Sequence, residues 1–494
     1  MEHPNLLFLY TDQQRADTLA AYGNARIEMP NLNRLASRST VFEQAYVTQP
    51  VCTPSRSSLL TGLYPHTSGM LENNVALRAG ISCFPEMAPS LYATGHHGKW
   101  HLCDEVFAQH GFQDWVSAED MYRKHFSAGR DKNARSSYHH FLIENGFKPS
   151  KGQDVFGRSE TAALPEEFGK PAFLAREASR FIRENQRRPF ILFVNFLEPH
   201  TPNTGPRNAQ YDPAALPLPP NFNCPPGPEQ HLKPQLFWRA YNDARFRGAK
   251  LQTEADWRRE IARYWGLCSL VDTHAGAILK TLEDCGLMDK TIIAYTSDHG
   301  DMMGSHRLLH KCLMYEEATR VPFVIRLPGQ RRQRRVAGPV SHIHVVPTLL
   351  DLMEHAIPGH LQGQSLRSAV EGSTAYGDAG GAIGQAFIEW NGSNHSLGGS
   401  DTASDFHEIC HGLCSWEEAA AALSDRVRTV VAREGWKFNY SPRGDHELYN
   451  LKDDPIETRN LARNSDYRPV MRDLGDRIRR WQERTGDTVA LPDL

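Results

Sequence analysis

Four short apolar runs constrain the fold of this chain most strongly, because each is nearly uninterrupted. They are Leu6–Tyr10, Pro189–Phe196, Thr291–Tyr295 and Val321–Arg326. Runs of this length and composition are typical of strands that are covered on both faces, as in a parallel sheet. The stretch Trp257–Cys285 between them has apolar residues at helical spacing. We therefore predict an α/β fold in which helices flank a large, mostly parallel or mixed central sheet.

Polar side chains directly follow two of these runs. Asp12 and Gln13 come after the first run, and Asp298 and His299 come after the third. Ligands of open α/β sheets bind beyond the carboxyl ends of the strands. Two such ends on one sheet edge predict a cation site, although Asp12 taken alone is equally well explained as a helix cap.

The stretch Pro50–Gly69 predicts a helix that begins beside a cysteine. Cys52 precedes Thr53 and Pro54, which are suited to the cap and the first helical position. The free N–H groups at a helix start favour an anion, and Arg56 adds a charged donor. The pattern indicates an anion pocket beside a reactive side chain. The alternative is a small buried cysteine before an ordinary capped helix.

The last quarter of the chain has a different composition and predicts a smaller unit. Segments Arg428–Ala432 and Trp436–Tyr440 read as antiparallel strands, and Tyr467–Thr485 reads as a closing helix. We predict a large α/β domain over residues 1–372 and an α+β subdomain over residues 373–494.

Charge and cysteine content exclude several classes of partner. The formal net charge of −3 gives no basic excess, so we expect neither a nucleic acid nor an anionic membrane as partner. No apolar run is long enough to span a bilayer, and the first residues lack the pattern of a secretory leader. Nine scattered cysteines do not form a disulfide framework. We expect a cytoplasmic protein, provided that no leader has been removed.

Four metal-binding residue types near the end of the chain fall at helical spacing. They are His407, Cys410, His411 and Cys414. Such a set could hold zinc. It is more often a buried helix face, and His407 could equally reach a substrate pocket.

Several motifs together resemble one enzyme family. Cys52-x-Pro54-Ser55-Arg56, followed by Leu60-Thr61-Gly62, is similar to the signature of the formylglycine-dependent sulfatases of the alkaline phosphatase superfamily. Further segments resemble the family in the same order along the chain: Asp12-Gln13-x-Arg15, Gly98–Leu102, Glu198–His200, Ser297–Gly300, Lys311 and Glu447–Pro455.

This resemblance implies a modified cysteine and a divalent cation. A formylglycine-generating maturation enzyme would oxidise Cys52 to an aldehyde. Calcium would be held by Asp12, Gln13, Asp298, His299 and the modified Cys52. Many members have an aspartate at the position of Gln13 and an asparagine at that of His299. Since a histidine nitrogen is a softer ligand than calcium prefers, Mg²⁺ and Mn²⁺ are alternative ions for this site.

The resemblance also implies a role for each remaining site residue. Arg56 would hold the nucleophile, and His101 would be the base that assists sulfate release. Lys99 and Lys311 would neutralise the sulfuryl oxygens, and His200 would act on the leaving oxygen. Because Lys99 and His101 alternate, they would point to the same side of an extended segment.

The substrate implied is a sulfated small molecule or oligosaccharide, and we expect a carbohydrate O-sulfate. Two other functions stay open. One is phosphonate monoester or phosphodiester hydrolysis by the same superfamily fold. The other is a non-catalytic anion-binding protein in which Cys52 is unmodified. Oligomeric state is equally open, a homo-oligomer included.

Overall fold

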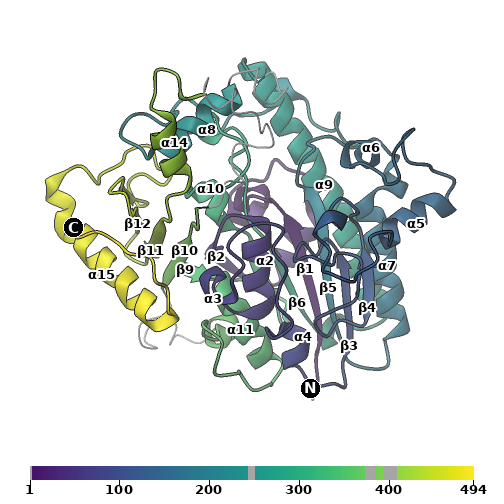
Figure 1. Cartoon of the computed structure of the whole chain (residues 1–494). Helices are drawn as coiled ribbons and strands as arrows, with labels where there is room; N and C mark the ends of the chain where they lie inside the picture. The colour runs from purple at the N-terminus through teal and green to yellow at the C-terminus, as the bar shows by residue number, and fades with distance from the viewer. Residues whose placement is uncertain (1–2, 243–250, 373–383, 393–408) are drawn as a thin grey trace.

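A nine-stranded mixed sheet forms the centre of the larger part of the molecule (Figure 1). The computed structural model describes residues 3–242, 251–372, 384–392 and 409–494. The strand order is β4-β3-β5-β1-β6-β8-β2-β7, and β9 pairs with β2. The strands are β1 (Asn5–Asp12), β2 (Thr40–Tyr46), β3 (Ala93–Gly98), β4 (Asp114–Ser117), β5 (Phe190–Pro199), β6 (Thr291–Ser297), β7 (Arg320–Val321), β8 (Phe323–Arg326) and β9 (Arg334–Ser341).

Five neighbouring strands, from β4 to β6, are mutually parallel, whereas β8 runs antiparallel to both β6 and β2. This confirms the predicted mixed sheet. The fourth apolar run is divided at Pro322 into β7 and β8. A proline has no backbone N–H for the sheet, and the break between the two strands falls on this residue.

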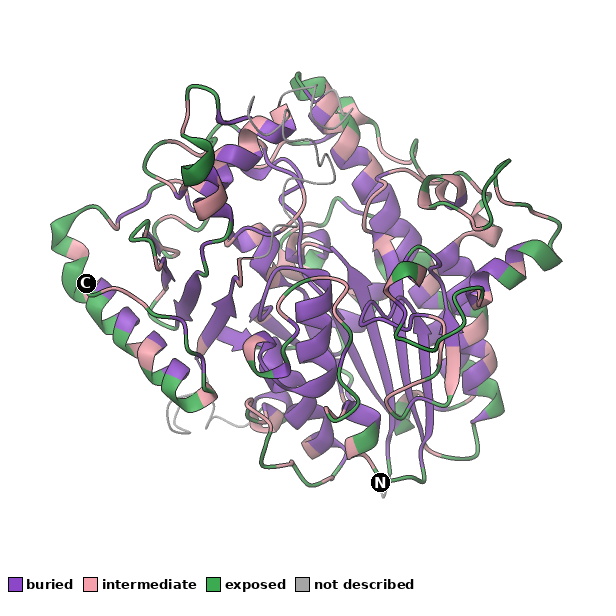
Figure 2. Ribbon diagram, viewed as in Figure 1, coloured by how far each residue is buried: buried purple, intermediate pink, exposed green. Residues whose placement is uncertain are grey.

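Helices cover both faces of the sheet, as the apolar runs predicted. Leu7 and Leu9 of β1 belong to one core cluster, and Leu6 and Phe8 belong to another. Successive side chains of a strand point to opposite faces, so the two clusters lie on the two sides of the sheet. Figure 2 shows the central strands buried along their length. The main covering helices are α7 (Lys170–Glu184) and α9 (Glu254–Asp284) for the first cluster, and α2 (Cys52–Thr61) and α11 (Val345–Leu352) for the second.

The segment between Val106 and Arg188, which carries no readable sequence pattern, is more regular than its sequence indicates. It holds β4, α7 and two short helices, α5 (Ser137–Glu144) and α6 (Arg158–Ala162). The proline-rich stretch after β5 is a long loop, and α8 (Leu232–Asn242) follows it. Helix α1 (Pro30–Ala36) has a proline at its first position, where the missing N–H costs nothing.

A separate antiparallel sheet lies in the C-terminal part. Its four strands follow one another in the order β10 (Gln385–Glu389), β11 (Arg428–Ala432), β12 (Trp436–Tyr440) and β13 (Glu447–Asn450). Helix α15 (Arg468–Thr485) packs on this sheet, where the Trp481 and Phe387 rings stack at 5.3 Å between centroids. The predicted sheet and closing helix are confirmed. The domain boundary at residue 372 stays a prediction, since residues 373–383 lie outside the described part.

A buried ion cluster joins the two sheets. The Lys437 ammonium on β12 lies 3.0 Å from a carboxylate oxygen of Glu316 and 2.9 Å from one of Glu457. Glu316 begins α10 (Glu316–Thr319), the short helix that leads into β7 of the large sheet. The smaller sheet is thereby tied to the chain segment that follows Lys311.

Two further predictions concern membrane-spanning segments and disulfides. In the described ranges no helix is long and apolar enough to cross a membrane. All nine cysteines fall in those ranges, and no disulfide joins any of them.

Candidate active site

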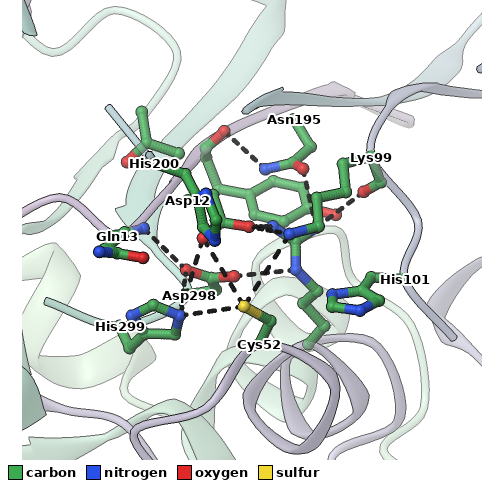
Figure 3. A network of polar contacts seen from close by, with 12 residues as sticks. Asp12, Gln13, Cys52, Lys99, His101, Asn195, His200, Asp298 and His299 are labelled. Atoms are coloured by element: carbon green, nitrogen blue, oxygen red, sulfur yellow. Dashed lines mark hydrogen bonds and ion pairs between the residues drawn. The ribbon is translucent and has the colours of Figure 1, made fainter. Parts of the chain in front are cut away.

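The candidate site lies where the carboxyl ends of β1 and β6 meet the start of α2 (Figure 3). These strands are parallel neighbours, with Thr11 opposite Ser297. Asp12 and Asp298 are consequently brought together at one sheet edge, and the backbone N–H of Gln13 donates to Asp298 Oδ1 at 3.0 Å. The predicted pairing of two strand ends is thus present in the structure.

Cys52 is the first residue of α2, and its side chain faces this sheet edge. The helix starts two residues earlier than predicted, with the extended Val51 as its cap. Thr53 does not cap the helix, because its hydroxyl donates to the His101 carbonyl at 2.6 Å. The prediction that Thr53 is the cap and Pro54 the first helical residue was wrong.

The Cys52 thiol is only 1% exposed and lies among charged groups. Its sulfur is 3.1 Å from Lys311 Nζ, 3.3 Å from His299 Nε2 and 3.7 Å from Asp12 Oδ1. Burial and Asp12 raise the pKa of this thiol, but Lys311, Lys99 and His299 outweigh them and bring it to about 7. The pocket therefore favours negative charge at this atom.

Arg56 ties the two aspartates together beneath the cysteine. Its Nε donates to Asp298 and its Nη2 to Asp12, each at 2.8 Å, while Nη1 donates to Asn195 Oδ1 at 2.7 Å. The guanidinium is fully buried. Among the described residues, its hydrogen bonds go to the two carboxylates, to Asn195 of β5 and to the Lys99 carbonyl rather than to the cysteine sulfur. Its geometry is that of a group that orders the site.

Four residues present ligand atoms at distances suited to a cation. They are Asp12, Cys52, Asp298 and His299, whose ligand atoms all lie within 4.8 Å of one another. His299 Nδ1 lies 2.9 Å from the Gly300 carbonyl, a bond in which the nitrogen must donate. With that proton on Nδ1, the lone pair of Nε2 faces the cluster, as in a metal-binding histidine. This donor set fits a divalent cation.

Gln13 adds an amide oxygen to the same cluster. Its Oε1 accepts from Lys311 Nζ at 2.8 Å, and its Nε2 donates to the Asp301 carboxylate. Asp301 also accepts from the backbone N–H groups of Met303 at 2.7 Å and His310 at 3.1 Å. Asp301 thus fixes which end of the Gln13 amide faces Cys52. The sequence analysis did not single out Asp301, although it stands only three residues after Asp298.

Lys99 is a second lysine close to the cysteine. Its ammonium is 2.5 Å from Asp12 Oδ2 and 3.9 Å from the Cys52 sulfur. Although burial lowers the pKa of Lys99, Asp12 raises it above its usual range, so the side chain stays charged. The preceding residue, Gly98, allows the backbone to bring Lys99 to this place. Its φ is +115°, and a Cβ there would lie 1.9 Å from the Asn195 carbonyl oxygen.

His101 reaches the site through a turn and not through an extended segment. Its φ of +59° places it in the left-handed region, so the segment that carries Lys99 and His101 is not extended there. The prediction that the two residues alternate along an extended segment was wrong. The imidazole packs on the Tyr122 ring at 4.3 Å, with Nε2 at 3.3 Å from Asn74 Oδ1. Its buried Nδ1 has no hydrogen-bond partner among the described residues. Burial, together with Lys99 and Arg56, holds the pKa of His101 well below its usual range.

A buried glutamate holds this turn in place. Glu105 accepts from the backbone N–H of Trp100 at 2.8 Å and from that of His101 at 2.7 Å. Burial raises the pKa of Glu105 to about 7 in spite of these bonds. Glu105 was not predicted as a site residue, because only its fold-dependent contacts reveal it.

His200 completes the set and brings two further residues with it. Its Nδ1 lies 2.8 Å from the Thr201 carbonyl oxygen and 3.5 Å from Arg158 Nη1. Burial and Lys311 hold the pKa of His200 well below its usual range. Arg158 and Tyr122, whose hydroxyl accepts from Arg158 at 2.8 Å, come from the segment that carries no readable motif.

The cysteine and histidine set near the end of the chain does not form a second centre within the described residues. His407 lies outside them. Cys410, His411 and Cys414 are described, and their ligand atoms do not gather into a cluster like that of Asp12, Cys52, Asp298 and His299.

Comparisons with known proteins agree with this geometry. Residues 4–355 match the family model described as Sulfatase. An arylsulfatase of Clostridium perfringens is 27% identical over 94% of this chain and 91% of its own length. An N-acetylglucosamine-6-O-sulfatase of Bacteroides thetaiotaomicron is 24% identical over 98% of this chain and 87% of its own. The solved phosphonate monoester hydrolase of Silicibacter pomeroyi superposes with a TM-score of 0.77 at 23% identity, covering 98% of this chain and 96% of that one, which shows a shared fold.

Proposed function

The chain belongs to the sulfatase family, and from that premise we propose that it hydrolyses a sulfate monoester of a carbohydrate. The observation that carries the proposal is the setting of Cys52. Two lysines lie close to its sulfur, Lys311 Nζ at 3.1 Å and Lys99 Nζ at 3.9 Å, beside a pair of aspartates that can hold a cation. This arrangement neutralises the charge of a sulfuryl group that reacts at position 52.

Formylglycine made from Cys52, in its hydrated form, would supply an oxygen nucleophile together with a second hydroxyl through which sulfate is expelled. Lys99 and Lys311 are placed to bind the sulfuryl oxygens. Both are kept charged by acidic neighbours, since Asp12 raises the pKa of Lys99, and Cys52 with Asp12 raises that of Lys311, against the lowering effect of burial.

A divalent cation would be held by Asp12, Gln13, Asp298, His299 and the modified residue 52, and would stabilise negative charge on the nucleophile and the sulfuryl group. The family resemblance implies calcium. The nitrogen ligand offered by His299 also suits Mn²⁺. Metal analysis of the purified protein decides between the two ions.

His101 is suited to be the base that removes a proton from the residue 52 hydroxyl. Its low pKa keeps the imidazole neutral, and its buried Nδ1 has an unused lone pair. The contact of Nε2 with Asn74 Oδ1 requires Nε2 to carry the proton, because an amide oxygen only accepts. Asn74 therefore selects the tautomer that leaves Nδ1 free to act.

His200 would act on the leaving oxygen. Its Nδ1 donates to the Thr201 carbonyl, so Nε2 of the neutral ring is an acceptor. The negative charge of a bound sulfate ester raises the pKa of a neighbouring imidazole and favours the doubly protonated form. In that form Nε2–H can donate to the ester oxygen as it leaves.

Phosphonate monoester or phosphodiester hydrolysis is the second candidate. Asp12-Gln13 at the cation site favours it, because some formylglycine-dependent hydrolases of that kind have the same pair. Lys99 and His101 favour sulfate, since we associate that pair with true sulfatases. Phenyl sulfate, a phenyl phosphonate monoester and a phosphodiester, compared under equal conditions, separate the two: a higher kcat/KM for the phosphorus esters would reject the sulfatase proposal.

The first experiment combines mass spectrometry with turnover. Protein co-produced with a formylglycine-generating enzyme is digested with trypsin, and the peptide Ser39–Arg56 is weighed while an aryl sulfate is assayed. We expect an aldehyde at Cys52 and release of sulfate. Cys52→Ala should abolish turnover. An intact thiol and no turnover, despite the maturation enzyme, would instead support a non-catalytic anion-binding protein.

A further inference from the structure

Arg158 is a charged side chain close to the reacting groups that has no role in the proposed chemistry. It lies beside both histidines: its Nη1 is 3.5 Å from His200, and its Nη2 donates to Tyr122, whose ring packs on His101. Its charge reaches the centre, because it is one of the groups that lower the pKa of His101 and of His200.

The hydrogen bonds of Arg158 leave one end of the guanidinium available. Nε donates to Glu119 at 2.7 Å, and Nη2 is shared between Glu119 and Tyr122. Nη1 has only the long contact with His200 Nδ1, and that atom already lies 2.8 Å from the Thr201 carbonyl oxygen. Within the described residues, the N–H groups of Nη1 are thus nearly unused.

The local charge is positive on this side of the site. Glu119 is 2% exposed and accepts from Arg158 and from Lys170, so one carboxylate faces two cations. Burial raises the pKa of Glu119, but Arg158 and Lys170 outweigh it and bring the value to about 2, so the glutamate is charged. Glu198 also lies nearby, and burial raises its pKa, which weakens its contribution as an anion. Of the other acidic groups that line the cavities on this side, Glu166 pairs with Arg207 and Asp120 accepts from Ser136.

Two cavities meet at Arg158 and Lys170. One is a small cavity of about 30 Å³ that opens to solvent and is lined by His200 and Glu198 as well. The other has a volume of about 210 Å³ and is lined by His139 and Phe156 as well. The side chain of Arg158 keeps 17% of its surface exposed. A group that enters the site beside His200 therefore comes close to the Arg158 side chain.

We propose that Arg158 Nη1 binds a second anionic group, a carboxylate or a further sulfate, on the part of the substrate that leaves with the ester oxygen. The inference rests on the proposed function, since it places the leaving group at His200. An arginine with a free planar end suits either anion, and a charge-assisted bond of this kind contributes about 1.5–3 kcal/mol.

Matched pairs of aryl sulfates test the proposal with fully converted enzyme. The carboxylate pair is 3-carboxyphenyl sulfate against 3-carbamoylphenyl sulfate, and the sulfate pair is 1,3-phenylene disulfate against 3-hydroxyphenyl sulfate; the para isomers are run alongside. We expect the wild-type kcat/KM to favour the anionic member of at least one pair. Which pair it is identifies the anion.

The variant Arg158→Gln should reduce that preference by roughly 10-fold or more while the neutral member is still hydrolysed. Arg158→Lys should keep part of the preference, since it keeps the charge. Arg180→Gln, a change to an arginine on α7 that pairs with Asp114 and Glu184, is the matched control and should leave the preference intact. Thermal unfolding checks that each variant is folded.

Three results would overturn the inference. In the first, the wild type shows no preference in any pair. In the second, the preference survives Arg158→Gln. In the third, Arg158→Gln and Arg158→Lys lower kcat/KM equally for both members of a pair, which would mark Arg158 as structural only. A fully converted wild type that hydrolyses neither these aryl sulfates nor a panel of carbohydrate O-sulfates would instead overturn the proposed function, and this inference with it.

Discussion

Asp12 shows how a single side chain serves both the fold and the chemistry. Its Oδ2 accepts from Arg56 at 2.8 Å and from Lys99 at 2.5 Å, while its Oδ1 faces the Cys52 sulfur at 3.7 Å. Burial raises the pKa of Asp12, but Lys99, His200 and Arg56 lower it well below the usual value. Removing this carboxylate would leave buried cations without compensation, so its loss affects stability as well as activity.

The tautomer and low pKa of His101 lead to a prediction for the pH profile. A base must be neutral to act, and activity that depends on it is lost as the pH falls through its pKa. Because that pKa lies well below 6.5, kcat/KM should not fall on account of His101 between pH 7 and 6. The pH profile of the wild type measures this, and Asn74→Ala, which frees the tautomer, is the comparison. An acid limb above pH 6.5 that shifts in Asn74→Ala would contradict the assignment.

Asp301 should control the cation through Gln13. In Asp301→Asn, the new amide can donate to Gln13 and favours the flipped orientation, which turns Gln13 Nε2 toward Lys311 and Cys52. We expect metal affinity to fall by roughly 10- to 100-fold, as is usual when a group that orients a ligand is changed. Titration calorimetry with Ca²⁺ and with Mn²⁺ measures the affinity.

The matched control is Asp284→Asn, a change to an exposed aspartate whose partner is Lys280 in the same helix. It should bind metal as the wild type does. Unchanged affinity in Asp301→Asn would mean that Gln13 is held in place without this bond.

At the scale of elements, what could be predicted depended on local pattern. The apolar runs predicted β1, β5 and β6. The start of α2 was misplaced by two residues, because Thr53 bonds to His101, which is 48 residues away. Arg158 and Tyr122 were missed because nothing in their sequence neighbourhood indicates the contacts that bring them to the site. Asp301 stands close to Asp298 in the sequence, but its contact with Gln13 joins residues that are 288 positions apart.

The turn from β3 into the Lys99 loop depends on a close approach that only glycine permits. In Gly98→Ala, the added Cβ would meet the Asn195 carbonyl of β5 at 1.9 Å, so the strands must separate. We expect activity to be lost and the melting temperature to fall, since Asn195 also accepts from Arg56.

Gly23→Ala separates this effect from backbone strain. Gly23 has a similar φ of +102°, but nothing lies within 4 Å of the position of its Cβ. Its substitution should cost only about 1–2 kcal/mol and leave turnover unchanged. Equal effects of the two substitutions would show that strain, and not the approach to β5, decides the role of Gly98.

At the scale of the whole molecule, the two sheets depend on each other. The family match ends at residue 355, yet Lys437 beyond it binds Glu316, five residues after Lys311. The smaller sheet thus helps to hold the segment that carries one of the two lysines beside Cys52.

Lys437→Met should reveal this dependence. It leaves Glu316 and Glu457 buried without their shared cation, and breaking such a cluster costs about 3–5 kcal/mol. Differential scanning calorimetry should show a lower melting temperature, with an earlier transition for the smaller sheet. The control is Lys452→Met, at a position outside this cluster. A Lys437→Met protein as stable as the wild type would show that the other contacts between the sheets, such as the bond from the Glu389 N–H to the Thr48 carbonyl, suffice without this cluster.

The burial of Cys52 has a consequence for the order of events in the cell. With 1% of its surface exposed, and with α2 and two strand ends around it, the thiol is closed to a second protein once the chain has folded. The proposed oxidation must therefore act on the nascent or unfolded chain. The fraction of active enzyme then depends on the relative rates of modification and folding. Slower synthesis or more maturation enzyme therefore raises the yield of active molecules and leaves the yield of folded ones unchanged.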